Sequence, residues 1–345
     1  SDSDEKTAQT MLSTIAQLLD ENSHAKIVLT SRKSSIFAGE LFEEWSDKHL
    51  PHCQITRIQI IPPVVSDWLD ESKIKLLRSR GIVFDDISNP TLLTFLSSQS
   101  NEDIASKFTS VDSILQQYFK ILLEREQERQ SLPLKVDEQL SLMESVAGTM
   151  ASFKQSTCTS SEIKDIIRMS LGEDILEYLD RYSDFSKEDV PTEDEFLQKL
   201  SHHALLDRIP NTSNSIGFIN DFIFGYLIAE AITIHQFPDL SPTEIEEKYW
   251  NLMVTSYGSC SQKKRDALYR LITDNKVEFT PFEELHTDLA LLHKTSHEYA
   301  RRYYESVYFG ENILLTSSNF KDCVFSCCTF NSCSIFSDAF EDCKF

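Results

Sequence analysis

The sequence predicts a mostly helical protein that begins with a fragment of an α/β sheet and ends in a solenoid. Two short apolar runs, at residues 26–30 and 54–61, are typical of buried strands. Between Asp67 and Tyr308 the apolar residues recur at helical spacing almost throughout. From residue 315 onward, large apolar residues recur every five positions, a period that neither a helix nor a strand keeps on one face.

Length and composition favour a folded cytoplasmic protein of several domains. A chain of 345 residues exceeds the size at which single cores stop growing. Its share of 41% apolar and 26% charged residues is that of a soluble chain, and no run reaches the length of a membrane span. The start SDSDEKTAQ lacks the basic and apolar regions of a signal peptide. We therefore expect no membrane partner.

The charge balance argues against a nucleic-acid partner. Acidic residues number 55 and basic residues 33, which gives a net charge of −22. A phosphate backbone would be repelled by such a field unless a basic patch opposed it, and the sequence contains no evident basic patch.

The first predicted elements follow the order helix, strand, helix, strand. Apolar residues at helical spacing between 11 and 19 predict the first helix, and another is expected around residues 41–48. The runs KIVLT (26–30) and QITRIQII (54–61) are apolar and rich in β-branched residues, without polar alternation. With only about two strands present, we expect an incomplete α/β sheet.

Helices dominate the middle of the chain, with one exception. The short apolar segments 204–209 and 215–220 flank the turn-forming run PNTSN at 210–214 and predict a β-hairpin. Helices combined with one hairpin suggest a winged-helix module. Helical spacing predicts helices over 67–80, 90–98, 111–130, 136–154, 161–182, 193–206, 221–234, 243–256, 261–274 and 282–306.

The carboxy-terminal segment repeats every five residues. Mostly small residues stand two places before each large apolar one, with Asp338 as the charged exception. The pattern resembles the pentapeptide-repeat family, whose chains form a right-handed, four-sided (quadrilateral) β-helix with both positions pointing inward. The resemblance implies that the repeat cysteines fill the core. The large apolar residues are Leu315, Phe320, Phe325, Phe330, Ile335, Phe340 and Phe345.

We expect all eight cysteines to be reduced and free of metal. The cysteines two places before a large apolar residue lie five or ten positions apart, and the segment has no CxxC pair of the kind found in structural zinc sites. Residues 315–345 cover little more than one coil and stop in phase with the repeat. We therefore expect the natural protein to continue beyond Phe345.

The run KIVLTSR resembles the sensor strand of the NACHT family and related STAND signalling ATPases. In that family a buried strand ends in Thr-Ser-Arg, which reaches the phosphates of the nucleotide. Ligands of open α/β sheets bind at the carboxyl ends of strands, where an arginine can recognise a phosphate. The resemblance implies that Ser31 and Arg32 sense the nucleotide. The alternative is an exposed arginine that merely follows a buried strand.

Two further segments match the family in the family's order. The run NPTLL at 89–93 resembles the Asn-Pro-Leu motif that opens a helix of the small helical domain, which implies that Pro90 packs on adenine. Proline is also common at the start of any helix, so both interpretations stay open. The run GFINDFIFGYLIA at 217–229 resembles the winged-helix signature Phe-x-His-x-x-x-x-Glu-Tyr-Leu-Ala-Ala.

The winged-helix match departs from the family at two positions. Asn220 stands where the family has the histidine that contacts the β-phosphate of ADP, and Gly225 stands where it has glutamate. An asparagine amide can donate a hydrogen bond to a phosphate, but it supplies no charge and no pH dependence. Asn220 either keeps a weaker nucleotide contact or caps the helix that starts at residue 221.

This chain alone is not expected to hydrolyse ATP. No GxxxxGK[ST] phosphate loop occurs, and the acidic start at residues 1–5 resembles the loop after a Walker B strand. The resemblance implies that the full-length protein is an ATPase using ATP or ADP and magnesium. We predict no catalytic residue and no metal ligand, because GxSxG is absent and His202-His203, which lacks ligand spacing, is expected to be a surface pair.

Together these matches predict a nucleotide-dependent signalling switch with a pentapeptide-repeat sensor, of a kind used in prokaryotic defence. We expect a protein ligand on the repeats as its trigger and a homo-oligomer on activation. A scaffold of helices and repeats without a nucleotide switch is the alternative, and a DNA-binding winged helix is disfavoured by the charge. The predicted domains are 1–65, the carboxy-terminal part of a P-loop NTPase core; 66–130, helical; 131–236, winged helix; 237–310, helical; and 311–345, the first repeats.

The switch interpretation makes a geometric prediction. One nucleotide can bias a domain arrangement only if it contacts several domains. Arg32, Pro90 and Asn220 should therefore converge on one cleft at the carboxyl end of the 26–30 strand.

Overall fold

The structure is a computed structural model of the whole chain, which divides into two compact units, Ser1–Ile61 and Pro62–Phe345. In the first unit, residues 14–16 and 18 are helical, where the first helix is predicted. The predicted strands at 26–30 and 54–61 lie outside the described residues. The structure describes residues 14–16, 18–19, 48–49, 64–82, 90–185, 190–208, 215–234, 245–292, 297–305, 307–309, 318–330 and 339–345.

The second unit is mostly helical and opens with five helices. The side chain of Asp70 accepts a hydrogen bond from the backbone of Lys73, and this cap breaks the predicted helix over 67–80 into two. The predicted helices over 90–98 and 111–130 are confirmed, whereas the seven-residue α6 was not predicted. These helices are α3 (Val65–Trp68), α4 (Glu71–Ser79), α5 (Pro90–Ser98), α6 (Asn101–Lys107) and α7 (Val111–Gln130).

Five helices and a small antiparallel sheet follow, and the fifth helix, α12, comes after the last strand. The elements are α8 (Val136–Ser152), β1 (Thr157–Thr159), α9 (Ser160–Leu171), α10 (Asp174–Phe185), α11 (Glu193–Ser201), β2 (Leu206–Arg208), β3 (Ser215–Phe218) and α12 (Asp221–Thr233). The strand order is β1-β3-β2, and Leu206 pairs with Phe218, so the predicted hairpin is confirmed. The three-residue β1 was not predicted.

Two predicted helices of this region are too long. The helix expected over 161–182 ends at Leu171, because Gly172 follows with a φ of 55°, which favours glycine. The helix expected over 193–206 ends at Ser201, and the chain then enters β2.

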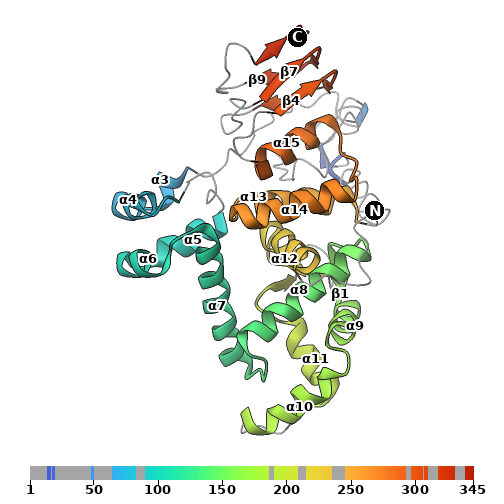
Figure 1. The fold of residues 1–345 in the computed structure, drawn as a ribbon. Coiled ribbons are helices and arrows are strands. Elements are labelled where there is room, and N and C mark those ends of the chain that lie inside the picture. The colour runs from blue at the N-terminus through green and yellow to red at the C-terminus, as the bar shows by residue number, and fades with distance from the viewer. Residues whose placement is uncertain are drawn as a thin grey trace. The chain divides into compact units, whose positions relative to one another are not determined.

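Helix α12 lies at the centre of the helical core, beside α8 and α13 (Figure 1). Its residues from Phe222 to Ile232 are all buried, as expected for a helix that is apolar on every side. Three helices complete the core: α13 (Glu247–Gly258), α14 (Gln262–Asp274) and α15 (Pro281–Leu292). Within the described ranges no helix is long and apolar enough to cross a membrane.

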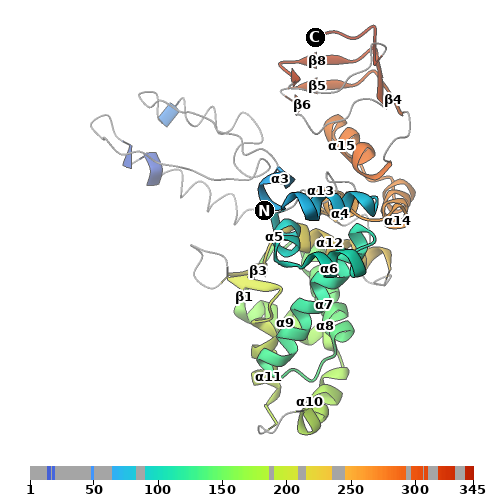
Figure 2. The ribbon, with the colours of Figure 1, turned by 90° about the vertical axis from the view of Figure 1, so that its left-hand side faces the viewer.

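The chain ends in short parallel strands. The pairs are β4–β7–β10, β5–β8 and β6–β9, and β5 and β8 run side by side in Figure 2. Tyr299 pairs with Phe320, 21 positions later, and Phe320 with Phe340, 20 positions later. The strands are β4 (His297–Ala300), β5 (Tyr303–Glu305), β6 (Tyr308–Phe309), β7 (Ser318–Lys321), β8 (Val324–Ser326), β9 (Thr329–Phe330) and β10 (Phe340–Glu341).

The aromatic rings of these strands stack in columns, as the five-residue period predicts. The ring centroids of Phe320 and Phe340 are 5.2 Å apart, and those of Phe309 and Phe330 are 4.5 Å apart. Leu315 and Ile335 lie outside the described residues. The helix expected over 282–306 is wrong beyond Leu292, because the parallel strands begin at residue 297.

Helix α15 joins two separate hydrophobic clusters. Its Leu285 packs into the cluster of strand rings, together with Tyr299 and Tyr304, whereas Leu291 belongs to the helical core. The Tyr299 hydroxyl donates to Asp288 Oδ2 of α15 at 2.9 Å inside this contact. The end of the strand stack that faces α15 is thus covered by the helix.

Candidate functional site

The first turns of α5 and α12 meet at one hydrogen bond. Asn220 Nδ2 donates to Thr91 Oγ1 at 3.0 Å, although the two residues are 129 positions apart. Pro90, the neighbour of Thr91, is the first residue of α5 and is exposed. The structure therefore brings together two of the three predicted segments, those of Pro90 and Asn220.

Asn220 caps α12. Its backbone is extended, and its Oδ1 accepts a hydrogen bond from the backbone N–H of Ile223 at 2.8 Å. The capping alternative is therefore confirmed. The amide nitrogen still carries a second hydrogen, so a nucleotide contact remains chemically compatible with the cap and stays a prediction.

Ser31 and Arg32 lie outside the described residues. Their convergence with Asn220 therefore stays a prediction, as does their role as nucleotide sensors. The described half of the site offers an amide and a hydroxyl near a helix amino terminus, where the backbone dipole favours an anion. Asp221 in the first turn places a negative charge at the same end.

Gly225 permits a close approach between α12 and α13. A Cβ atom at this position would lie 2.3 Å from the Leu252 carbonyl oxygen and 2.7 Å from Ser256 Oγ. The Ser256 hydroxyl lies 2.8 Å from the carbonyl oxygen of Phe222 on α12. No side chain fits here without displacing α13, so packing explains why this position holds glycine.

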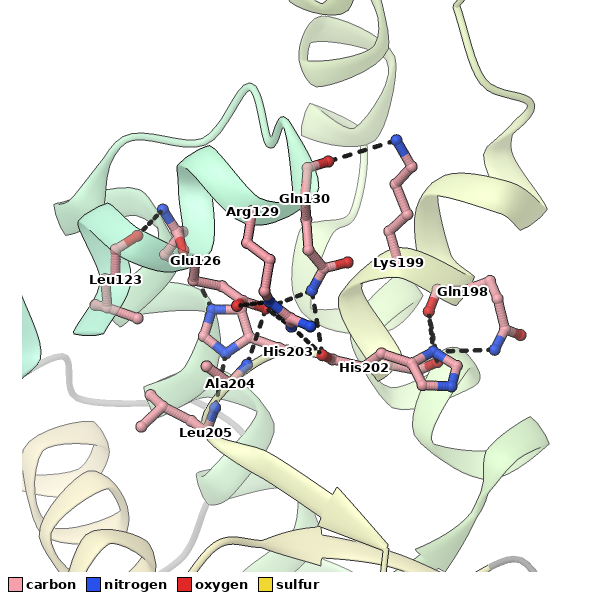
Figure 3. A network of polar contacts seen from close by, with 12 residues as sticks. Leu123, Glu126, Arg129, Gln130, Gln198, Lys199, His202, His203, Ala204 and Leu205 are labelled. Atoms are coloured by element: carbon pink, nitrogen blue, oxygen red, sulfur yellow. Dashed lines mark hydrogen bonds and ion pairs between the residues drawn. The ribbon is translucent and has the colours of Figure 1, made fainter.

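A second polar network, shown in Figure 3, centres on the buried carboxylate of Glu126. Arg129 donates to both of its oxygens, at 2.8 and 2.9 Å, and the backbone N–H of Ala204 donates at 2.9 Å. Burial opposes ionisation of Glu126, yet the hydrogen bonds from Arg129 and Gln130 outweigh it and lower its pKa. The carboxylate thus ties the end of α7 to the turn between α11 and β2.

His203 belongs to the same network and is fully buried, so the prediction of a surface histidine pair is wrong for this residue. The Leu205 N–H donates to its Nδ1 at 3.2 Å, and its Nε2 donates to Gln139 Oε1 at 3.2 Å. Burial lowers the pKa of His203 to about 4, so the ring is neutral at pH 7 and its role is structural. His202 is exposed, as predicted.

The thiols of the strand stack donate hydrogen bonds to the preceding layer. Cys323 Sγ lies 3.2 Å from the Tyr299 carbonyl oxygen, and Cys343 Sγ lies 3.2 Å from that of Phe320. Among the described residues no group of histidine, cysteine and acidic side chains is placed to hold a metal. The described free cysteines are Cys158, Cys260, Cys323, Cys327, Cys328 and Cys343.

Sequence reasoning missed two features of this region. The role of Gly225 depends on α13 and has no signal in the sequence around residue 225. The ion pair between Glu230 of α12 and Lys264 of α14 was also missed, although Glu230, an acidic residue inside the apolar run YLIAEAI, was a usable signal.

Comparison with known proteins adds no assignment. No family model, no curated protein and no solved structure matches the chain.

Proposed function

We propose that the chain belongs to a nucleotide-dependent signalling switch of the NACHT type, in which an ATPase core controls a pentapeptide-repeat sensor arm. The hydrogen bond between Asn220 and Thr91 carries this proposal. A nucleotide that controls domain arrangement has to contact several domains, and this bond joins the helix opened by Pro90 to the winged-helix segment. In the proposed switch Ser31 and Arg32 sense the terminal phosphate of ATP bound with magnesium.

The remaining roles follow from the same geometry. Pro90 is exposed at the start of α5, where a planar adenine could stack on it. Asn220 would offer its second amide hydrogen to the β-phosphate of ADP while its oxygen keeps α12 capped. ADP would then stabilise the contact between α5 and α12, and exchange of ADP for ATP would release this contact.

The parallel strands support a sensor arm built as a four-sided β-helix. Strand partners recur after 21 and then 20 residues, close to four faces of five residues each. The outward side chains of such a coil form a continuous surface suited to a protein ligand.

The charges on the winged-helix segment favour a protein partner over DNA. Helix α11 begins with three acidic residues, and two of them pair with α9: Asp194 with Lys164 at 3.1 Å and Glu193 with Arg168 at 2.7 Å. A phosphate backbone at this face would have to displace those carboxylates.

The test uses the full-length protein and three substitutions of Asn220. Asn220→Ala removes both cap and amide donor, Asn220→Asp keeps the cap and replaces the donor with a carboxylate that can only accept, and Asn220→His restores the residue of the family. We expect less retained ADP in the Ala and Asp variants and more in the His variant, measured by chromatography of the released nucleotide. The Ala variant should lose folding stability by about 1 kcal/mol, whereas the Asp variant should keep it.

The scaffold alternative predicts a different outcome. In a scaffold, ATP and ADP leave hydrogen exchange in residues 90–98 and 215–234 unchanged, and all three variants retain no nucleotide. That result would replace the switch with a binding scaffold, for which the attachment of the strand stack to the core through α15 is the supporting observation.

A further inference from the structure

The turn between α11 and β2 has three successive backbone donors, and each finds an acceptor. The N–H of Ala204 donates to Glu126 Oε1 at 2.9 Å (Figure 3). The N–H of Leu205 donates to His203 Nδ1 at 3.2 Å, and that of Leu206 donates to the carbonyl oxygen of the same histidine at 2.8 Å. Two of the three acceptors thus belong to His203, so the path of the chain into β2 depends on this residue.

The contacts of the His203 ring fix its tautomer. A backbone N–H can only donate, so Nδ1, which receives the Leu205 N–H, carries no proton. On the other side of the ring, Gln139 Nε2 lies 3.4 and 3.1 Å from the carbonyl oxygens of Leu123 and Leu134. The Gln139 Oε1 therefore faces His203 Nε2, at 3.2 Å, and accepts its proton. Both contacts are satisfied only while the ring is neutral.

Leu205 connects this histidine to the start of α12. Its carbonyl oxygen accepts a hydrogen bond from the N–H of Ile219 at 3.0 Å, beside the pairing of β2 with β3. The residue after Ile219 is Asn220, which caps α12 and donates to Thr91 Oγ1 of α5. A row of contacts thus runs through His203, Leu205, Ile219 and Asn220, and we call these four residues the hairpin relay.

Two charged side chains of α7 act on the His203 ring. Arg129 donates to both oxygens of Glu126, so their opposite charges largely offset each other. From α8 the ring meets the uncharged Gln139, and His202, its neighbour in the chain, is exposed. Burial is the largest effect and lowers the pKa of His203 to about 4, while the charge of Glu126 raises it and that of Arg129 lowers it.

We propose that His203 is a proton-sensitive positioning residue: its neutral ring holds the hairpin relay and so keeps the start of α12 against α5, and a proton added at Nδ1 breaks the relay. A protonated Nδ1 would present an N–H to the N–H of Leu205, so two buried donors would face each other without an acceptor. The hairpin would lose its hold at Leu205 first, and the contact between Asn220 and Thr91 would follow. The inference concerns the protein without ligand and does not depend on the proposed nucleotide switch.

Proton linkage gives the direction of the pH effect. The pKa of His203 falls from 6.5 in the unfolded chain to about 4 in the folded protein. Stability contributed by the neutral ring is therefore present above pH 6.5 and is lost as pH falls from 6.5 towards 4. Measurements above pH 5 exclude most of the titration of Glu126, whose pKa lies below its ordinary value of 4.5.

The experiment uses two variants that remove the titrating group and keep opposite halves of its contacts. Asparagine can place its amide oxygen where Nδ1 lies, and glutamine can place its amide nitrogen where Nε2 lies. His203→Asn thus keeps the acceptor for Leu205, whereas His203→Gln keeps the donor to Gln139. Urea unfolding and hydrogen exchange, expressed as protection factors, are measured from pH 7.5 to pH 5.0 on the whole chain.

The parent should respond to acid and the two variants should not. Between pH 7.5 and 5.0 the unfolding constant of the parent should rise roughly 25-fold relative to either variant. Protection of residues 205–208, 215–224 and 90–98 in the parent should fall together as pH falls. At pH 7.5 these segments should be better protected in His203→Asn than in His203→Gln, because only asparagine keeps the relay.

Two controls separate the relay from general destabilisation. His202→Gln changes the exposed neighbouring histidine and should leave the pH profile of the parent unchanged. In Asn220→Ala, residues 205–208 should still lose protection as pH falls. Residues 90–98 should no longer respond to pH in that variant, because the hydrogen bond to Thr91 is gone.

Three results would overturn the proposal. The first is that the parent and both His203 variants keep parallel pH profiles. The second is that His203→Gln protects the hairpin as well as His203→Asn does at pH 7.5. The third is that residues 90–98 still respond to pH in Asn220→Ala. If neither His203 variant folds, the parent decides with His202→Gln as its reference: constant protection of residues 205–208 and 90–98 down to pH 5.0 would refute the proposal.

Discussion

Asn220, which caps α12, and Gly225 within the helix show how one side-chain atom, or its absence, can decide local structure. Asn220 uses its side-chain oxygen to cap the helix and its nitrogen to reach Thr91, so one amide both starts α12 and attaches it to α5. Five residues later, Gly225 has no side chain, and the backbone of α13 occupies the space where a Cβ would lie. Each of these residue types thus has a structural cause.

Gly225→Ala is expected to destabilise the protein by about 1–3 kcal/mol, because the added methyl group would overlap the Leu252 carbonyl oxygen and force α13 away. In an exposed helix the same change would increase the free energy of unfolding by up to about 1 kcal/mol, so the sign of the change distinguishes a close contact from an open position. Urea unfolding measures this free energy in both proteins. Gly258→Ala is the matched control, because its Cβ would meet the Ala290 Cβ at 3.2 Å, and it should have the smaller effect. A Gly225→Ala protein as stable as the parent would contradict the close approach.

Whole elements are held together by polar contacts that the sequence pattern does not reveal. The Glu126 carboxylate connects the carboxyl end of α7 to the turn before β2, two segments far apart in the chain. In the strand stack, the corners at Arg301, Asp322 and Asp342 all have positive φ, from 52° to 57°. The left-handed backbone conformation thus recurs after each of the paired strands β4, β7 and β10, without the glycine that such a conformation usually favours.

Glu126→Ala is expected to cost about 1–3 kcal/mol of stability, because the Ala204 N–H and the Arg129 guanidinium would lose their acceptor. Thermal and urea unfolding measure the loss, and hydrogen exchange should rise at the turn before β2. Glu128→Ala, an exposed glutamate on the same helix, is the control and should stay within about 0.5 kcal/mol of the parent. Equal losses of stability in Glu126→Ala and Glu128→Ala would mean that the Glu126 network does not help to hold the end of α7 against the turn before β2.

Helical spacing and the five-residue period predicted most of the elements of the second unit, because both patterns are local. The bounds of α5 and α7 match the expected segments, since each helix has an apolar stripe and a defined start. The strands β4, β5 and β6 were missed because their aromatic residues are out of step with the later repeat: Tyr299 lies 21 residues before its partner Phe320, not 20. The five-residue pattern counted back from Phe320 therefore misses Tyr299, and this segment was interpreted as the end of a helix.

The candidate site was only partly accessible from the sequence. The proximity of Pro90 and Asn220 was expected from family resemblance, whereas the hydrogen bond through Thr91 required coordinates, because nothing local links residues 129 positions apart. The burial of two helical glutamates, Glu144 and Glu230, was not predicted. Glutamate and lysine on helices are usually solvated, and only three-dimensional packing shows that Glu144 and Glu230 are buried.

At the scale of the whole second unit, two hydrophobic clusters are joined through α15. One side of the helix, with Leu285 and Leu289, covers the ring stack of the strands, and Leu291 faces the helical core. Arg302 adds a hydrogen bond to Glu284 at 2.6 Å across the first contact. The helix therefore acts as the end cap of the strand stack and as its attachment to the core, which a repeat structure needs at an exposed apolar end.

This arrangement predicts that two substitutions on α15 act on different halves of the unit. Leu285→Ala should leave a cavity beneath the ring stack and destabilise it by about 2–5 kcal/mol, whereas Leu291→Ala should do the same to the helical core. Hydrogen exchange resolved by segment separates them: residues 297–305 and 318–330 should exchange faster in the first variant, and α12 with α13 in the second. If each variant accelerates exchange equally in both segments, the clusters unfold as one body, and α15 is an ordinary core helix and not a boundary between them.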